Sequence, residues 1–335
     1  MNDASNTTQQ LGNVFSAIQP TNIPTIGNYL GALKNWVSLQ QDYTCYYAIA
    51  DLHSLTLCLD GAVLRNNIID LYALLLACGI DVDRSVFFAQ SSVAEHSQLA
   101  WVLNCYTQYG QASRMTQFKD KSLRQVDNVN VGLFAYPILQ AADILLYNTM
   151  HVPIGADQKQ HLELTRDIAE RFNSRFSPTF VVPNILIPKI GAKINSLQNP
   201  THKMSKSDDN VNAYVLLTDD NDTIVRKIKR AVTDSGDSIE YIDAKPGIAN
   251  LLSIYSAFEN ITIQQAVLQF VTKSYAVFKD NVAQCVLSHL QPIRDSYVKL
   301  KADKSYIQDC MAKGADRARV IAHKTLSKVY KKIGL

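Results

Sequence analysis

Short apolar runs alternate with helical patterns in the first third of the chain, and this alternation constrains the fold more than any other feature. The apolar runs predict three buried strands, at 14–18, 45–50 and 85–90. Helical patterns follow them, at 28–39, 64–78 and 94–108. Strands that alternate with helices are typical of a parallel sheet covered on both faces. We therefore predict an α/β fold with a doubly wound, Rossmann-like sheet that binds ligands at the carboxyl ends of its strands.

The remainder of the chain changes from this mixed pattern to helices. An apolar helix is predicted at 134–147 and an amphipathic helix at 155–172. A further strand is predicted at 179–182, where Pro183 ends it. From residue 222 to the C-terminus the patterns are helical. We place a domain boundary near residue 206, so that a smaller, all-helical domain follows the sheet domain.

Charge and hydropathy exclude several classes of protein. The 335 residues carry a formal net charge of +3, which is far from the basic excess of a protein that coats nucleic acid. No apolar stretch reaches the roughly 20 residues that a membrane helix needs. The polar residues 1–10 contain none of the arginines of a transit peptide. We expect a cytoplasmic protein with no membrane contact.

The six cysteines form no C-x-x-C pair, and most of them lie inside apolar runs. Such cysteines are typical of buried thiols in a reducing compartment. We therefore expect no metal site, neither a structural zinc nor an iron–sulfur cluster.

The first candidate site is the loop at 19–28, which joins a predicted strand to a predicted helix. A helix start offers free N–H groups and the positive end of a dipole, so it favours phosphate. Gly27 would allow close approach of a nucleotide, and Thr25 and Asn28 carry donors for phosphate oxygens. The alternative is a structural role, in which Asn28 caps the helix and Gly27 allows tight packing. The loop has neither the Walker A pattern nor the dinucleotide fingerprint.

The second candidate site is the run Lys203-Met204-Ser205-Lys206-Ser207, in which two lysines stand among small hydroxyl residues. A loop of this kind can bring two ammonium groups onto a triphosphate, where they stabilise the charge of the leaving pyrophosphate. A solvated surface loop is the alternative for a generic pair of lysines at this spacing.

Together the two segments resemble the signatures of class I aminoacyl-tRNA synthetases. Thr25-Ile26-Gly27-Asn28 is similar to the HIGH signature, with Thr and Asn in place of its two histidines, and 203–207 matches the KMSKS signature. This variant is usual in the bacterial-type tryptophan–tRNA ligases. From about residue 13 to the C-terminus the chain resembles that family, in segments at 15–20, 26–32, 51–54, 115–119, 136–147, 157–173, 231–235 and 245–252.

The resemblance implies roles for individual residues. Asp143 would accept the indole N–H of tryptophan, although without the family it fits an internal cap or ion pair equally well. Other residues would hold the amino acid, namely Phe15, His53, Tyr136, Gln140 and Gln158. The residues that would line the ATP site are Gln19, Pro20, Thr21, Gly27, Asn28, Gly155, Ala156, Asp157, Ile194, Lys203, Met204, Ser205, Lys206 and Ser207. The catalytic set would be Lys203, Lys206, Lys121, Thr25 and Asn28.

Three positions depart from the family pattern. Ala17 stands where the family often has Gly, and Ala156 stands where it often has Glu. Gln140 stands where many bacterial members have Met against the indole. Gln140 makes the expected pocket more polar and resembles organellar-type members, so it bears on affinity and removes no reacting group.

The implied function is the ATP-dependent attachment of L-tryptophan to tRNA(Trp) through a tryptophanyl-adenylate. Mg²⁺ would be held mainly by the phosphates of ATP, and the family implies a homodimer. Residues 1–205 would form the catalytic domain, 206–300 an anticodon-binding domain, and 301–335 helices that pack back on the catalytic domain. A basic face at 226–230 would meet the RNA backbone or remain solvated. The alternatives are a tyrosine–tRNA ligase and a non-catalytic paralog that binds tryptophan or RNA.

Overall fold

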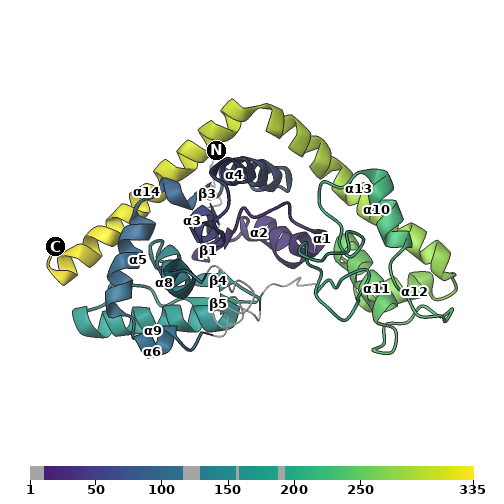
Figure 1. The fold of residues 1–335 in the computed structure, drawn as a ribbon, viewed down its shortest axis with the longest axis horizontal. Coiled ribbons are helices and arrows are strands. Elements are labelled where there is room, and N and C mark those ends of the chain that lie inside the picture. Colours follow the sequence, from purple (N-terminus) through teal and green to yellow (C-terminus); the bar gives the residue numbers. More distant parts are fainter. Residues whose placement is uncertain (1–10, 116–128, 156–157, 188–192) are drawn as a thin grey trace, which may run out of the picture.

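The computed structural model describes residues 11–115, 129–155, 158–187 and 193–335. Its centre is a parallel, five-stranded sheet in the order β3-β2-β1-β4-β5 (Figure 1). The strands are β1 (Asn13–Ile18), β2 (Thr44–Ile49), β3 (Val86–Ala89), β4 (His151–Pro153) and β5 (Asn184–Leu186). The chain builds outward from β1 to β3 and then returns to add β4 and β5 on the other side of β1. The strand order therefore reverses between β1 and β4, where such sheets open a crevice for ligands.

Successive side chains of the strands enter two separate cores. Val14 and Phe87 belong to one cluster of buried apolar residues, whereas Phe15 and Phe88 belong to another. Neighbouring residues of a strand point to opposite faces, so a sheet that is covered on both faces needs nearly continuous apolar strands. The predicted doubly wound sheet is confirmed.

Helices cover both faces of the sheet. The first core contains residues of α1 (Ile26–Asn28), a π-helical turn (Tyr29–Leu33), α2 (Lys34–Leu39) and α4 (Gly61–Ala77). The second core contains residues of α5 (Glu95–Tyr106), α8 (Val131–Leu145) and α9 (Lys159–Phe176). Two short helices, α3 (Asp51–Ser54) and α6 (Tyr109–Ala112), follow β2 and α5 along the chain. Asp60 caps α4 by accepting from two backbone N–H groups, and Gly79, with φ of 106°, follows the end of the helix, where glycine is favoured.

Beyond residue 206 the structure continues in helices. They are α10 (Asn221–Lys229), α11 (Pro246–Glu259), α12 (Ile263–Phe270), α13 (Tyr275–Ala302) and α14 (Lys304–Ile333). α13 packs against α10, α11 and α4, and α14 then returns to lie against β3 and α5 (Figure 1). Within the described ranges, no helix is both long enough and apolar enough to span a bilayer.

The core packing runs through the predicted boundary at residue 206. The first core extends from Leu30 beside the sheet to Ile224, Leu251 and Leu290 in the later helices. Ala315 and Leu326 of α14 lie in the second core. The functional division into 1–205, 206–300 and 301–335 stays a prediction.

The predicted strand at 179–182 is wrong, because the strand lies after Pro183 as β5. Asn173 Oδ1, near the end of α9, accepts hydrogen bonds of 2.9 Å from both Thr179 N and Phe180 N. The ring of Phe180 packs on Phe172 with 4.9 Å between centroids. These contacts fasten residues 179 and 180 to α9 instead of the sheet. No predicted strand corresponds to β4, which is three residues long.

The predicted basic face at 226–230 is wrong for Lys227. This side chain is buried, and its Nζ lies 2.7 Å from Asp219 Oδ2. Lys227 follows Ile224 by three positions, so the helical period turns it toward the same buried side. Lys229 remains exposed and pairs with Asp280 at 2.9 Å.

Candidate active site

A cavity of about 450 Å³ opens where the strand order reverses. Its walls come from the end of β1 and the loop that follows, from α8, and from β4 with the residues after it. Proteins usually bind small molecules in cavities of roughly 300–1,000 Å³. The cavity at this edge of the sheet is therefore of a size that is suited to a small-molecule ligand.

The cavity gathers residues that are far apart in the sequence. Predicted amino-acid-site residues line it, namely Phe15, His53, Tyr136, Gln140, Asp143 and Gln158. Predicted nucleotide-site residues also line it, namely Gln19, Thr21, Asn28, Gly155 and Lys206. Others lie outside this lining, namely Pro20, Thr25, Gly27, Ile194, Lys203, Met204, Ser205 and Ser207. Lys121, Ala156 and Asp157 lie outside the described residues, and their roles stay predictions.

The helix start at 25–28 is built as a reciprocal cap. Thr25 Oγ1 accepts a hydrogen bond of 3.3 Å from Asn28 N and donates one of 3.1 Å to Asn28 Oδ1. Thr25 N donates to the same oxygen at 3.0 Å. This arrangement satisfies two backbone donors of the first turn. Thr25 is buried, and its hydroxyl proton is already used, so the expected donation from Thr25 to phosphate is not what this geometry offers. Asn28 combines capping with a place in the cavity wall.

Gly27 lies where the two signature segments meet. A Cβ atom on Gly27 would lie 3.4 Å from Met204 Cβ and 3.6 Å from Ile194 Cβ. Met204 is buried, and its N–H donates to Ile194 O at 3.0 Å. Separations of 3.4 and 3.6 Å are ordinary contact distances, so packing against the lysine loop does not by itself require glycine at this position, and the nucleotide and packing roles of Gly27 both stay predictions. Met204 and Ile194 support the cavity from behind.

The two lysines of the loop differ in position. Lys206 lines the cavity, and its Nζ donates to Thr21 Oγ1 at 2.9 Å. Burial lowers the pKa of Lys206 to about 8. Lys203 is exposed and lies outside the cavity lining. The structure therefore brings one of the two predicted ammonium groups to the cavity.

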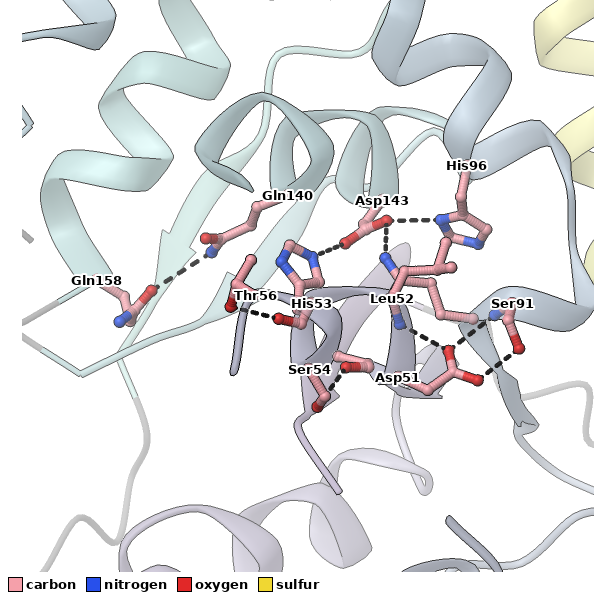
Figure 2. A network of polar contacts seen from close by, with 12 residues as sticks. Asp51, Leu52, His53, Ser54, Thr56, Ser91, His96, Gln140, Asp143 and Gln158 are labelled. Atoms are coloured by element: carbon pink, nitrogen blue, oxygen red, sulfur yellow. Dashed lines mark hydrogen bonds and ion pairs between the residues drawn. The ribbon is translucent and has the colours of Figure 1, made fainter. Parts of the chain in front are cut away.

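Asp143 is the centre of a buried polar network (Figure 2). Its Oδ2 lies 2.8 Å from His53 Nε2, and its Oδ1 lies 2.6 Å from His96 Nδ1. Gln90 Nε2 donates to Oδ1 at 2.7 Å. Burial by itself would raise the pKa of this carboxyl, but the hydrogen bonds from the two histidines outweigh burial and hold the pKa far below its usual range. Asp143 is therefore an anion at neutral pH.

A second carboxylate fixes the short helix that carries His53. Asp51 Oδ1 accepts from Leu52 N at 3.0 Å and from Ser91 N at 2.9 Å, and Oδ2 accepts from Ser91 Oγ at 2.5 Å (Figure 2). These bonds join the residues after β2 to the residues after β3. They hold His53 at the edge of the cavity.

Behind Asp143, His96 contacts Tyr147. His96 Nε2 lies 2.8 Å from the Tyr147 hydroxyl. The Tyr147 ring stacks on Phe15 with 5.6 Å between centroids and on Tyr46 with 4.7 Å. The predicted site residues include none of Gln90, His96 and Tyr147. The available signal is that Gln90 directly follows β3, at the edge where such sheets bind ligands, and that His96 lies in the first turn of the next long helix, α5.

The wall that contains Asp143 continues along α8 to the start of α9. The Tyr136 hydroxyl lies 2.8 Å from His161 Nε2, and Gln140 Nε2 donates to Gln158 Oε1 at 3.4 Å. Burial raises the pKa of Tyr136 to about 12, so its hydroxyl keeps its proton. Gln140, which departs from the family pattern, therefore has a polar partner in the same wall.

One group of possible metal ligands occurs in the described part of the chain, far from this cavity in the sequence. Glu259, Cys285 and His289 place their ligand atoms within 4.8 Å of one another. These atoms already interact, because Cys285 Sγ donates to Glu259 Oε1 at 3.1 Å and His289 Nδ1 lies 2.9 Å from Cys285 O. Burial raises the pKa of the Cys285 thiol, which disfavours the thiolate that a metal would need. The expectation of no structural metal stays a prediction.

The fold and the cavity define a nucleotide-binding α/β protein, and comparisons with known proteins specify the family. The sequence matches the family described as tRNA synthetases class I (W and Y) over residues 8–291. Tryptophan–tRNA ligase of Clostridium acetobutylicum is 47% identical over 322 residues, which are 96% of each chain. A tryptophanyl-tRNA synthetase structure from Mycoplasma pneumoniae has a TM-score of 0.87 at 34% identity and covers 96% of this chain and 97% of that chain.

A second solved structure bears on ligands. Tryptophanyl-tRNA synthetase from Campylobacter jejuni, complexed with ADP and tryptophan, has a TM-score of 0.84 at 32% identity. The similarity covers 96% of this chain and 100% of that chain. The chain belongs to the class I tRNA synthetases for tryptophan and tyrosine.

Proposed function

We propose that this chain attaches L-tryptophan to tRNA(Trp) in two steps. The carboxylate of tryptophan attacks the α-phosphate of ATP, which forms tryptophanyl-adenylate and releases pyrophosphate. The 2′-hydroxyl of the terminal adenosine of the tRNA then takes the aminoacyl group, and AMP leaves. Two relatives named tryptophan–tRNA ligase, at 47% and 46% identity, support this assignment.

The observation that carries the proposal is that one cavity contains a buried anion and a partly buried cation of the required kinds. Asp143 lies in a wall that also contains Phe15 and Tyr136, and Lys206 lies in the wall that contains Thr21 and Asn28. An indole has one polar atom, an N–H donor, which suits a single carboxylate among aromatic rings. A polyphosphate suits an ammonium group beside a helix start.

At the amino-acid end, Asp143 accepts the indole N–H, and Phe15 and Tyr136 pack on the ring. His53, Gln140 and Gln158 are the polar groups available to the ammonium and carboxylate of the substrate. The hydrogen bond between Gln140 and Gln158 supports a shared role, because it orients both amides toward the same wall.

At the nucleotide end, we assign Gln19, Thr21, Asn28, Gly155 and Lys206 to contacts with ATP. Lys206 stabilises the charge of the leaving pyrophosphate. Lys203 joins it only if the lysine loop moves toward the bound nucleotide. The phosphate contact that the family resemblance implies for Lys121 is part of the same proposal. Among the described lining residues Asp143 is the sole carboxylate, and the histidines already engage it. Mg²⁺ would therefore be held mainly by phosphate oxygens and water, where it neutralises phosphate charge.

The macromolecular part of the proposal concerns tRNA and a second copy of the chain. We assign the tRNA anticodon to the helices after residue 206 and expect a cytoplasmic homodimer. Three large apolar side chains, Trp101, Tyr109 and Val131, are 72%, 78% and 81% exposed on the helices α5, α6 and α8. Large exposed apolar side chains favour a protein interface where they are contiguous, and we assign the contact between the two copies to these helices.

Tryptophan-dependent exchange of pyrophosphate into ATP tests the function. We expect exchange with tryptophan and at most traces with tyrosine. Exchange with tyrosine alone would establish the tyrosine–tRNA ligase alternative. The absence of exchange with either amino acid, combined with tryptophan binding, would establish the non-catalytic paralog. Transfer of labelled tryptophan to tRNA tests the second step.

A further inference from the structure

We propose that His96 and Tyr147 form a positioning relay that gives Asp143 its preference for a ligand with an N–H donor. The relay rests on the proposed function, because it acts on the indole that Asp143 would bind. Neither His96 nor Tyr147 lines the cavity. Both residues therefore act through Asp143 and not by touching the substrate.

The hydrogen bonds of Asp143 leave one acceptor position open. A carboxylate offers about four lone-pair positions, two on each oxygen. Gln90 and His96 occupy both positions on Oδ1, at 2.7 and 2.6 Å. His53 occupies one position on Oδ2, at 2.8 Å. The remaining position is on Oδ2, the oxygen that Asp143 shares with His53, and both residues line the cavity.

The proton positions follow from the charge of Asp143. An ionised carboxylate only accepts hydrogen bonds, so His96 Nδ1 carries a proton and donates it to Oδ1. In a neutral imidazole Nε2 is then an acceptor, and the Tyr147 hydroxyl at 2.8 Å donates to it. Burial and the nearby Asp143 charge raise the pKa of Tyr147 well above its usual value, so this hydroxyl keeps its proton. The Asp143 carboxylate thus holds the His96 proton on Nδ1, and the Tyr147 hydroxyl stabilises the same tautomer by donating to Nε2.

The packing leaves the relay little freedom. His96 and Tyr147 are both fully buried. Tyr147 is stacked on Phe15 and Tyr46, and the His96 ring packs 5.8 Å from Phe88. The Phe15 ring lines the cavity, so the same aromatic group that holds Tyr147 also meets the ligand. Through the stacking of Tyr147 on Phe15, the relay therefore packs directly against the cavity wall that would contact the indole.

Loss of the Tyr147 hydroxyl would remove the preference of His96 for the tautomer that is protonated on Nδ1. His96 Nε2 would lose its donor, and the tautomer with a bare Nδ1 would become accessible. That tautomer turns a lone pair toward Oδ1, which favours protonation of the carboxyl. A carboxyl that is protonated on Oδ1 has lost its charge, so its Oδ2 accepts the indole N–H more weakly. The expected defect is therefore loss of recognition of one atom, not a general loss of binding.

A sulfur isostere of tryptophan isolates this atom. In 3-(1-benzothiophen-3-yl)alanine a sulfur atom replaces the indole N–H, while ring size and the amino-acid end are retained. The measurement is the ratio of kcat/KM for tryptophan to kcat/KM for this isostere in pyrophosphate exchange. We expect Tyr147→Phe to lower the ratio about fivefold to tenfold, the size of the one neutral hydrogen bond that the variant removes.

Two further variants control for damage to the fold. Tyr46→Phe removes a phenol oxygen from the same aromatic stack without touching His96, and it should leave the ratio unchanged. His96→Asn keeps an N–H near the Nδ1 position and removes the link to Tyr147. Its ratio should lie between those of the wild type and Tyr147→Phe, and adding Tyr147→Phe to it should lower the ratio no further.

The outcomes separate the relay from the proposed function. An unchanged ratio in Tyr147→Phe, or equal losses with tryptophan and the isostere, would overturn the relay while the function stands. Equal use of tryptophan and the isostere by the wild type would overturn both the Asp143 assignment and the relay. A reduced ratio in Tyr147→Phe with full activity of Tyr46→Phe supports the relay.

Discussion

At the scale of single residues, the two charged groups of the cavity have lowered pKa values for opposite reasons. Burial lowers the pKa of Lys206 because it disfavours the ammonium ion. For Asp143 burial acts in the other direction, and hydrogen bonds from His53 and His96 overcome it. Asp143 therefore holds its charge firmly, whereas Lys206 holds its charge only up to mildly alkaline pH.

Replacing Asp143 by Asn should weaken the recognition of tryptophan. The amide is uncharged and presents one acceptor oxygen, whereas the carboxylate accepts on both oxygens, from Gln90 and His96 on Oδ1 and from His53 on Oδ2. We expect the KM for tryptophan to rise about tenfold to a hundredfold, with a smaller change for phenylalanine. Exchange assays with tryptophan, tyrosine and phenylalanine measure this. Unchanged selectivity in a variant that melts at the wild-type temperature would contradict it.

Replacing Lys206 by Ala should affect the chemical step more than the binding of tryptophan. Its ammonium group lies at the nucleotide end of the cavity, where charge develops on pyrophosphate. We expect the rate of adenylate formation to fall at least about a hundredfold, with the tryptophan Kd changed less than about threefold. Single-turnover kinetics and equilibrium binding provide the two numbers. Equal losses in both would argue against this role.

The pKa of Lys206 also predicts a pH profile. Its pKa is about 8 in the folded, ligand-free chain, so the cation is present below pH 8 and is lost as the pH rises through that value. The affinity for ATP should therefore fall above pH 8. Lys206→Arg should keep its affinity to higher pH, because a guanidinium stays charged. Isothermal titration of both proteins from pH 7 to 9.5 tests this, and parallel curves for the two proteins would refute it.

At the scale of elements, the sequence predicts the long, patterned segments well and the short ones badly. β1, β2 and β3 follow apolar runs, and the helices that cover them have clear apolar stripes. β4 and β5 have three residues each, which is too short for a periodic pattern. Their position depends on tertiary contacts, such as the hold of Asn173 on residues 179 and 180.

The residues of the candidate site also differ in how far the sequence predicts them. Motifs identify the lysine loop and the helix start, because their residues are contiguous in the sequence. Asp143, His53 and Tyr136 come from the family resemblance. His96 lies 47 positions before Asp143 on a different helix, so no local spacing relates the two residues. Which histidine faces which carboxylate is set by the packing of α5 against α8.

Gly314 lies where α14 packs against β3, and its replacement tests how closely these two elements must approach. A Cβ atom on Gly314 would lie 1.8 Å from Phe87 O, so α14 meets the β3 backbone without a side chain between them. Gly314→Ala must push α14 away from β3, and we expect a loss of about 1–3 kcal/mol in the free energy of unfolding. Gly110→Ala is the control, since a Cβ atom there has no neighbour within 4 Å. Urea denaturation of both variants decides, and equal stability would contradict the prediction.

At the scale of the whole molecule, distant segments are joined by α13 and α14. α13 contacts α10 and α11 at one end and α4 at the other, and α14 returns to β3 (Figure 1). The first core is continuous from the sheet to the later helices. We therefore expect the described parts to unfold together in one transition, even if they bind different regions of tRNA.

The proposed dimer gives a test at this scale. Trp101→Asp places a charge among the exposed apolar residues of α5, α6 and α8, so it should convert a dimer to a monomer. Leu268→Asp is the matched control, because Leu268 is 74% exposed on α12, outside this group. Sedimentation equilibrium should show twice the mass of the chain for the wild type and the control. A monomeric wild type, or a dimeric Trp101→Asp protein, would contradict the interface.

The packing of α14 against β3 affects how the chain is protected while it is being synthesised. β3 is an edge strand, and the helix that covers it consists of 30 residues at the end of the chain. A ribosome adds residues from the N-terminus at about 5–20 per second, so the strands are complete long before their cover exists. An uncovered edge strand readily pairs with strands of other chains. Nascent copies on one messenger RNA are therefore exposed to aggregation through this edge until α14 has been synthesised.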